Sequence, residues 1–403
     1  MILPFPLFAV TLGEAFHAAI KHESVQIERS RFKQVESQID QARSSIFPEI
    51  NARGSYLIQQ DSPVFSSPVI DKNRKSLSLE LIQPLFQGFQ EFAAIRLAQG
   101  EKLAQMARLE RSKVELFSNL YQVFFSIKKI EQEIDHIEEL YQLSTERVNF
   151  IDQRVRIGRS RQSELISAKA QMMTVSSQLE GAKSRLIDQR ERFYTLTGLS
   201  SESEITLENF KDELGPLEFY LNKSQSSAWV KPEKFLFDAS EERVQIARAD
   251  YYPSFDLRAN YYPYREGSLE DVRWDVTFNM TIPLYSGGLR SARVRQAVHE
   301  KKESELRYRL QKKDVRENVR TAYLRLENGR SQLDHFRQAV RLNRENYELQ
   351  RREYGLGLVS NLDVLQALNQ YIQSRRDLSD LELENSQYYY QLMALTGDIF
   401  ENN

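Results

Sequence analysis

Residues 84–88 read Pro-Leu-Phe-Gln-Gly, and residues 283–287 read Pro-Leu-Tyr-Ser-Gly, 199 positions later. The Leu-Thr-Gly of residues 196–198 returns after the same interval at residues 395–397. An interval that stays constant over more than a hundred residues indicates a tandem repeat rather than chance similarity. The chain therefore contains one structural unit twice, and the fold has to be explained as a repeat.

The repeat extends toward the N-terminus with a small change of interval. Residues 42–48 read Ala-Arg-Ser-Ser-Ile-Phe-Pro and correspond to Ala-Arg-Ala-Asp-Tyr-Tyr-Pro at 247–253, 205 positions later. One loop that is shorter in the second half explains the difference. We expect a first repeat over about 11–198 and a second over 216–397, with residues 199–215 as a connector in an equatorial region.

Each repeat has the same predicted order of elements: a helix, two strands, and a long helical hairpin. The first helix is expected over about 11–46, and its counterpart over about 233–250. The hairpins are expected over 89–198 and 289–397. The first helix of the 89–198 hairpin contains no proline up to residue 154, so at 1.5 Å per residue it would be about 100 Å long.

Apolar and small residues in the long helices follow a 4-3-4-3 spacing, which is typical of a coiled-coil seam. A plain helical bundle is the alternative interpretation. The seam positions are Val315, Val319, Ala322, Leu326, Gly329, Leu333, Phe336 and Val340 in the second repeat and Ile130, Ile134, Ile137 and Tyr141 in the first.

Glycine follows each long helix, at Gly158 and Gly357. Glycine just beyond a periodic helix is a C-cap signal, because it adopts the left-handed conformation without strain. Residues 163–164 and 361–363 then offer side chains that could cap the next helix. Both segments are predicted to be the tips of helical hairpins.

Between the first helix and the hairpin of each repeat, the hydrophobic period changes to two. The alternation predicts strands over about 48–58, 74–83, 253–262 and 272–282. Arg53, Asp256, Arg258 and Asp275 fall on the polar face, which indicates a wet surface. The apolar face is expected to be lipid-facing and comprises Leu77, Leu79, Leu81, Phe255, Leu257, Trp274, Val276, Phe278 and Met280.

Strands of about ten residues with this alternation fit a membrane β-barrel. A soluble two-hairpin sheet packed on the helices is the alternative. Four strands cannot close a membrane barrel, for which about eight is the practical minimum. Two copies would supply eight strands and three would supply twelve, so the sequence predicts oligomerisation.

The composition limits the function further. The 403 residues carry a net charge of -2 and no cysteine, with a mean hydropathy of -0.55. Near-balanced charge provides no basic field for nucleic acid, and thiolate chemistry is excluded. No apolar run is long enough for an α-helical membrane span. Residues 1–10 are apolar and could be the stub of a signal peptide or an extended mature N-terminus.

No motif for catalysis, metal binding or a cofactor is present, so the chain is predicted not to be an enzyme. Its five histidines are interpreted as solvated helix surface, and so are the arginine pairs at 351–352 and 375–376. Tyr388, Tyr389 and Tyr390 are interpreted as helix packing.

The sequence resembles the TolC family of outer-membrane efflux proteins over nearly its whole length. The resemblance rests on Thr-Leu-Gly-Glu-Ala at 11–15, Ile-Phe-Pro at 46–48, the two corners at 83–88 and 282–288, both tips and both Leu-Thr-Gly ends. The opening signature is lost in the second repeat, where residues 216–219 read Pro-Leu-Glu-Phe.

The resemblance implies a mainly α protein with a membrane β-barrel: a TolC-like homotrimer with a twelve-stranded barrel in the outer membrane and a helical tunnel in the periplasm. It implies an exit duct for efflux or type I secretion that works with a periplasmic adaptor and an inner-membrane transporter. A soluble coiled-coil scaffold without transport activity is the alternative.

The resemblance also implies roles for residues near the tips. Asp363 matches an acidic position at the periplasmic constriction, and Gln366 stands where the family has a second acidic residue. Tyr354 and Glu164 match positions that link neighbouring helices, whereas Val359 replaces a basic partner. Asp363 as a helix cap is the alternative. The adaptor-docking residues implied are Gly158, Arg159, Ser160, Gly357, Leu358, Val359 and Ser360.

Overall fold

A computed structural model describes residues 10–58, 73–206, 214–267 and 269–397. The chain forms two compact units. The hairpin unit comprises Met1–Ile27, Glu110–Trp229 and Lys312–Asn403, and the sheet unit comprises Glu28–Leu109 and Val230–Gln311. Each unit takes segments from both sequence repeats. The N-terminal residues 1–9, for which a signal-peptide stub was considered, lie outside the described residues.

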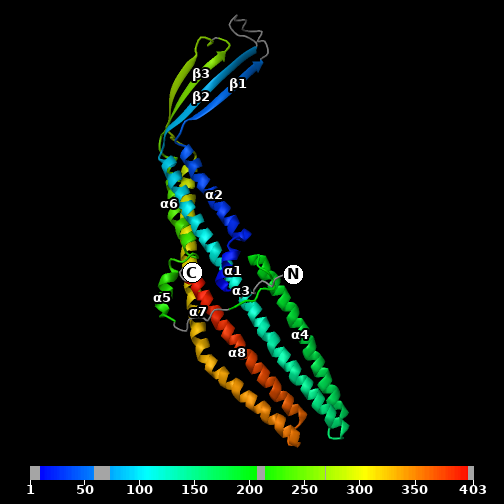
Figure 1. Cartoon of the computed structure of the whole chain (residues 1–403). Coiled ribbons are helices and arrows are strands. Elements are labelled where there is room, and N and C mark those ends of the chain that lie inside the picture. Colours follow the sequence, from blue (N-terminus) through cyan, green and yellow to red (C-terminus); the bar gives the residue numbers. More distant parts are fainter. Residues whose placement is uncertain (1–9, 59–72, 207–213, 268, 398–403) are drawn as a thin grey trace. The chain divides into compact units, whose positions relative to one another are not determined.

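The sheet unit contains four antiparallel strands in the order β1-β2-β3-β4, of which Figure 1 labels the first three. They are β1 (Glu49–Ile58), β2 (Asn73–Gln87), β3 (Ser254–Arg265) and β4 (Trp274–Thr281). The prediction of four strands per chain is confirmed, and β2 and β3 extend past the ranges expected from the alternation. Within the described residues, β1 and β4 each have one neighbouring strand, so both outer edges are unpaired.

The strand register places the apolar residues of all four strands on one face. Leu81 pairs with both Ile50 and Ala259, and Ala259 pairs with Val276. This apolar face stays exposed in the single chain: the side chains of Trp274 and Phe278 are 68% and 76% exposed. The face is therefore left open rather than covered, contrary to what a soluble two-layer sheet requires.

The opposite face of the sheet carries polar pairs that cross between strands. Asn260 Nδ2 donates to Asp275 Oδ1 at 2.8 Å, and Asn279 Nδ2 donates to an oxygen of Asp256 at 2.9 Å. Arg53 also forms an ion pair with Glu80 at 3.1 Å. These pairs satisfy the polar groups across the strands, so the two faces differ in chemistry as the period-two pattern predicted.

The helix expected over about 11–46 is interrupted. It forms α1 (Leu12–Ala19) and α2 (Glu23–Ser44). The Ser24 amide donates to His22 Nδ1 at 3.3 Å, which supplies a cap for the start of α2. In the second repeat α5 (Leu217–Ser224) has the length of α1, although the opening signature is lost there, and α6 (Lys231–Ala249) follows it.

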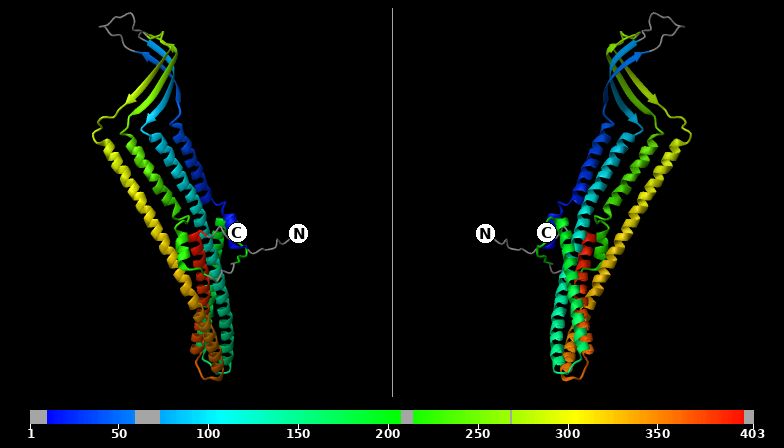
Figure 2. Two further views of the ribbon diagram at one scale, coloured as in Figure 1. Left: turned by 90° about the vertical axis from the view of Figure 1, so that its left-hand side faces the viewer. Right: turned by 90° about the vertical axis from the view of Figure 1, so that its right-hand side faces the viewer.

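The hairpins are formed by α3 (Gln90–Arg156) with α4 (Gln162–Thr197), and by α7 (Leu289–Leu356) with α8 (Asn361–Thr396). Their tips lie at the same end of the hairpin unit (Figure 2). No helix in the described part of the chain is long and apolar enough to cross a membrane. Large, fully buried side chains of this unit include Phe124, Phe193, Leu120, Ile127, Ile151, Ile205, Leu326, Leu368 and Leu392.

The first part of the predicted seam of α7 is a buried stripe, whereas Leu333, Phe336 and Val340 further along are half-buried. Val315, Val319, Ala322 and Leu326 are at most 2% exposed. At the next seam position, glycine allows α8 to approach closely: a Cβ atom on Gly329 would lie 1.9 Å from the side-chain oxygen of Asn385.

Two interpretations of the polar residues need correction. His136 is 5% exposed rather than solvated, and its Nε2 lies 3.1 Å from the Ser379 hydroxyl. Burial lowers the pKa of His136, with a further contribution from Arg375. Arg375 itself is half-buried and forms an ion pair with Glu139 of α3. The hydrophobic periodicity did not predict the burial of His136 and Arg375, because it assigns a residue to a face of its helix but does not show which neighbouring helix covers that face.

Candidate functional site

The first hairpin tip is a Schellman motif. Gly158 has φ +72°, its amide donates to the Val155 carbonyl at 3.0 Å, and the Arg159 amide donates to the Arg154 carbonyl at 2.7 Å. These two bonds satisfy carbonyl groups that the end of α3 would leave unpaired. The turn is therefore fixed by backbone bonds, and its side chains are free to face outward.

The second tip repeats this geometry. Gly357 has φ +78°, and its amide donates to the Tyr354 carbonyl at 3.0 Å. The Leu358 amide donates to the Glu353 carbonyl at 3.0 Å. The two tips thus have the same backbone design, which the repeated glycines predicted.

The helices after the tips are capped differently. Ser360 is the N-cap of α8: the Asp363 amide donates to its hydroxyl at 3.3 Å, and Asp363 accepts from the Ser360 amide at 2.8 Å. This is a capping box. α4 has Arg161 at its N-cap and no side-chain cap. Asp363 is therefore the third residue of its helix rather than the cap itself.

The Asp363 carboxylate lies on the exposed side of α8 with Gln366 one turn further on. Hydrogen bonds from Ser360 hold the pKa of Asp363 below its usual value. The group is ionised at neutral pH and supplies a negative charge at the surface. Capping and a charge role are compatible, because one oxygen accepts both bonds from Ser360.

Tyr354 and Glu164 are brought together through Ser160. The Ser160 hydroxyl donates to Glu164 Oε2 at 3.0 Å and lies 3.5 Å from the Tyr354 hydroxyl. The guanidinium carbon of Arg154 lies 4.9 Å from the centroid of the Tyr354 ring, and the same guanidinium donates to the backbone carbonyl of Tyr354 at 3.3 Å. These contacts connect the two tips within one chain, and Ser160 has this role in addition to the docking role expected of it.

The predicted docking residues at the tips are largely exposed. Leu358 is 71% exposed, whereas Val359 is half-buried against the cluster around Tyr354. Leu356, which the sequence reasoning did not single out, is 75% exposed, and Ile157 at the first tip is 65% exposed. Each tip therefore presents large apolar side chains to solvent.

Sequence reasoning missed the arginines that connect the hairpins. Arg147 Nε donates to Asn361 Oδ1 at 2.9 Å, and Arg351 forms an ion pair with Glu146 at 3.1 Å. The arginine pair at 351–352 was interpreted as a solvated face, and both residues are exposed, but the ion pair of Arg351 with Glu146 was not foreseen. The sequence around a charged residue on a helix surface does not indicate that a second hairpin lies opposite that residue.

A family model and several known proteins match most of the chain. The family described as outer membrane efflux protein matches residues 17–199 and 231–398. The outer membrane protein TolC of Escherichia coli is 20% identical over 376 residues, which cover 89% of this chain and 75% of TolC. The proteases secretion protein PrtF of Dickeya chrysanthemi is 22% identical over 423 residues, which cover 98% of this chain and 90% of PrtF.

Solved structures share the fold. The outer membrane protein VceC of Vibrio cholerae superposes with a TM-score of 0.85 at 17% identity, covering 96% of both chains. The CmeC outer membrane channel of Campylobacter jejuni gives a TM-score of 0.85 at 18% identity, covering 96% of this chain and 85% of CmeC. The chain therefore has the same fold as these solved structures.

Proposed function

The chain belongs to the outer membrane efflux protein family, and from this premise we propose that three copies join edge to edge into a twelve-stranded barrel. The observation that carries the proposal is the sheet: in the described part of the chain it has four strands, two unpaired outer edges and one exposed apolar face. Pairing β4 of one copy with β1 of the next removes every edge. It also leaves the apolar face toward lipid and the polar face toward the lumen.

The protein is an outer-membrane exit duct for efflux or type I secretion, and it extends into the periplasm. The family consists of channels rather than enzymes, and we propose no catalytic activity or cofactor for this chain. The alternative of a soluble scaffold without transport is not favoured, because the sheet face would then stay exposed to water.

A periplasmic adaptor and an inner-membrane transporter are proposed as the partners. The support is the pair of tips, whose backbone bonds are satisfied and whose Leu356, Leu358 and Ile157 side chains are exposed. Apolar side chains on a helical turn suit a partner that offers another helical hairpin. The adaptor would contact Gly158, Arg159 and Ser160 on one tip and residues 357–360 on the other.

Replacing Gly357 by valine should abolish export while leaving trimers and barrels intact. A non-glycine residue at φ +78° costs about 1–2 kcal/mol and deforms the turn that presents Leu358. Export of a reporter substrate and adaptor cross-linking would be measured in cells. Gly198→Val is the matched control. Gly198 also has a left-handed backbone with open space around it, but it caps the C-terminal end of α4 rather than a hairpin tip. Normal export in Gly357→Val would count against docking at the tips.

We propose that Asp363 forms the charged ring of a periplasmic constriction, with Gln366 beside it. Three-fold symmetry would bring three carboxylates together, which raises the negative potential and favours cations. The lowered pKa of Asp363 supports this role, because the carboxylate is ionised at neutral pH.

Asp363→Asn should lower the cation-to-anion permeability ratio by roughly twofold or more, because the ring loses its charge. The ratio would be obtained from reversal potentials of single channels in planar bilayers under a KCl gradient. Gln366→Glu should change the ratio in the opposite direction. Asp334→Asn, at a side chain that is 79% exposed on α7, removes a charge elsewhere and should leave the ratio unchanged. Equal ratios in all four channels would place the constriction elsewhere.

A further inference from the structure

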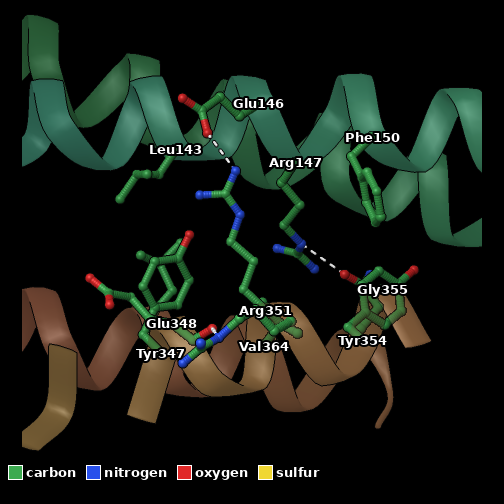
Figure 3. A pocket seen from close by; sticks show the side chains of 13 residues that line it. Leu143, Glu146, Arg147, Phe150, Tyr347, Glu348, Arg351, Tyr354, Gly355 and Val364 are labelled. Carbon is green, nitrogen blue, oxygen red and sulfur yellow. Dashed lines mark hydrogen bonds and ion pairs between the residues drawn. The ribbon is translucent and has the colours of Figure 1, made fainter. Parts of the chain in front are cut away.

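A cavity of about 550 Å³ lies between the two hairpins near their tips. Figure 3 shows Arg147 and Phe150 reaching into it from α3, and Tyr347, Arg351 and Tyr354 lining it from α7 on the opposite side. Its size is that of an ordinary small-molecule site.

Arg147 is the partly buried cation among the three arginines that line the cavity, the others being Arg351 and Arg352. Its Nε donates to Asn361 Oδ1 at 2.9 Å, and among the described residues no carboxylate lies within ion-pair distance of its guanidinium. Burial lowers the pKa of Arg147, because the charge is partly removed from water. A partly buried guanidinium without a counter-ion is costly, and a bound anion would remove much of that cost.

The two carboxylates that line the cavity are already neutralised. Glu146 forms an ion pair with Arg351 at 3.1 Å, and Glu348 forms one with Arg344 at 3.1 Å. Neither is therefore available to Arg147. The lining carries more arginines than glutamates, and Arg352 is exposed, so the partly buried positive charge is that of the Arg147 guanidinium, whose two terminal nitrogens suit a carboxylate.

The remaining walls are aromatic and apolar. Phe150 and Tyr354 lie at one end, with ring centroids 5.8 Å apart. Tyr347 is held in place by stacking on Tyr371, with ring centroids 6.3 Å apart and planes inclined by 4°. Fixed ring faces beside a cation suit a flat aromatic ligand with one negative group.

We propose that this cavity binds an aromatic monocarboxylate, with its carboxylate at the Arg147 guanidinium and its ring against Tyr347, Phe150 and Tyr354. Such a ligand contacts α3 of the first hairpin and α7 of the second, so it ties the hairpins together. The site is distinct from the exposed Asp363 face and does not depend on the exit-duct function, since binding is measured directly.

The test is isothermal titration calorimetry of the full chain in detergent with 1-naphthoate and with its uncharged analogue 1-naphthamide. The carboxylate should bind at least about tenfold more tightly than the amide, because only the carboxylate pairs with a charged donor. Equal affinity of the two compounds, or no saturable binding of either, would overturn the proposal without reference to any variant.

Two variants separate charge from local structure. Arg147→Gln and Asn361→Ala both break the bond between α3 and α8, but only the first removes the charge. Arg147→Gln should weaken 1-naphthoate binding at least about tenfold, whereas Asn361→Ala should keep it within about threefold. Arg156→Gln, an exposed arginine on the same helix outside the cavity, should bind like the wild type. Equal losses in the first two variants would assign Arg147 a structural role and overturn the proposal.

Discussion

Phe278→Arg should prevent most of the protein from inserting into the outer membrane. Phe278 lies mid-strand on the apolar face and is 76% exposed in the single chain. An arginine facing lipid near the centre of a barrel strand costs roughly 2–4 kcal/mol. A trimer carries the substitution three times, so one assembly incurs this free-energy cost in each of its three copies.

The matched control is Asn279→Arg, one residue along the same strand. Its side chain belongs to the polar face, where Asn279 donates to Asp256 at 2.9 Å. A cation there would meet a carboxylate rather than lipid, so insertion should stay near the wild-type level. Membrane fractionation and native mass measurement in detergent would quantify inserted trimers. Similar behaviour of both variants would show that the two sheet faces are assigned the wrong way round.

The second large effect is expected at Gly329 of α7, against which the side chain of Asn385 from α8 packs. A Cβ atom there would lie 1.9 Å from Oδ1 of Asn385, a residue that is only 1% exposed. Gly329→Val should destabilise the hairpin by about 1–3 kcal/mol and lower the melting temperature on the order of 5 °C. Thermal unfolding followed by circular dichroism would measure it.

A double-mutant cycle isolates the contact. Asn385→Ala removes the obstructing side chain, so Gly329→Ala combined with Asn385→Ala should be clearly more stable than the sum of the single changes predicts. Gly181→Val is the control, because the nearest atom to its added carbon is the end of Arg185 at 3.8 Å. Additive losses in the cycle would mean that the two residues do not limit the approach of α7 to α8.

The four strands and the two hairpins follow from local patterns. Period two between residues 48 and 84 predicts strands because successive side chains point to opposite faces. The seam at Val315–Leu326 predicts a buried stripe because a 3.5-residue spacing keeps one face of a helix toward its partner. The tips follow from Gly158 and Gly357, since glycine adopts the left-handed turn without strain.

Local patterns failed where the chain makes long-range polar contacts. His136 reads as a charged helix surface and is buried against Ser379 of α8. The break between α1 and α2 also escaped prediction, because no proline or glycine marks it. Among the candidate site residues, the pairing of Tyr354 with Glu164 through Ser160 needed the position of both tips.

The sequence by itself determined the repeat, the element types and the face that each strand residue occupies, because these depend on periodicity and on glycine, which act over a few residues. Only the tertiary structure decided which charges meet. Arg147 lies 214 residues from Asn361, and only the two hairpins side by side show that no carboxylate of the described residues pairs with it. Electrostatic partners depend on distance in space, which a sequence pattern on one helix does not encode.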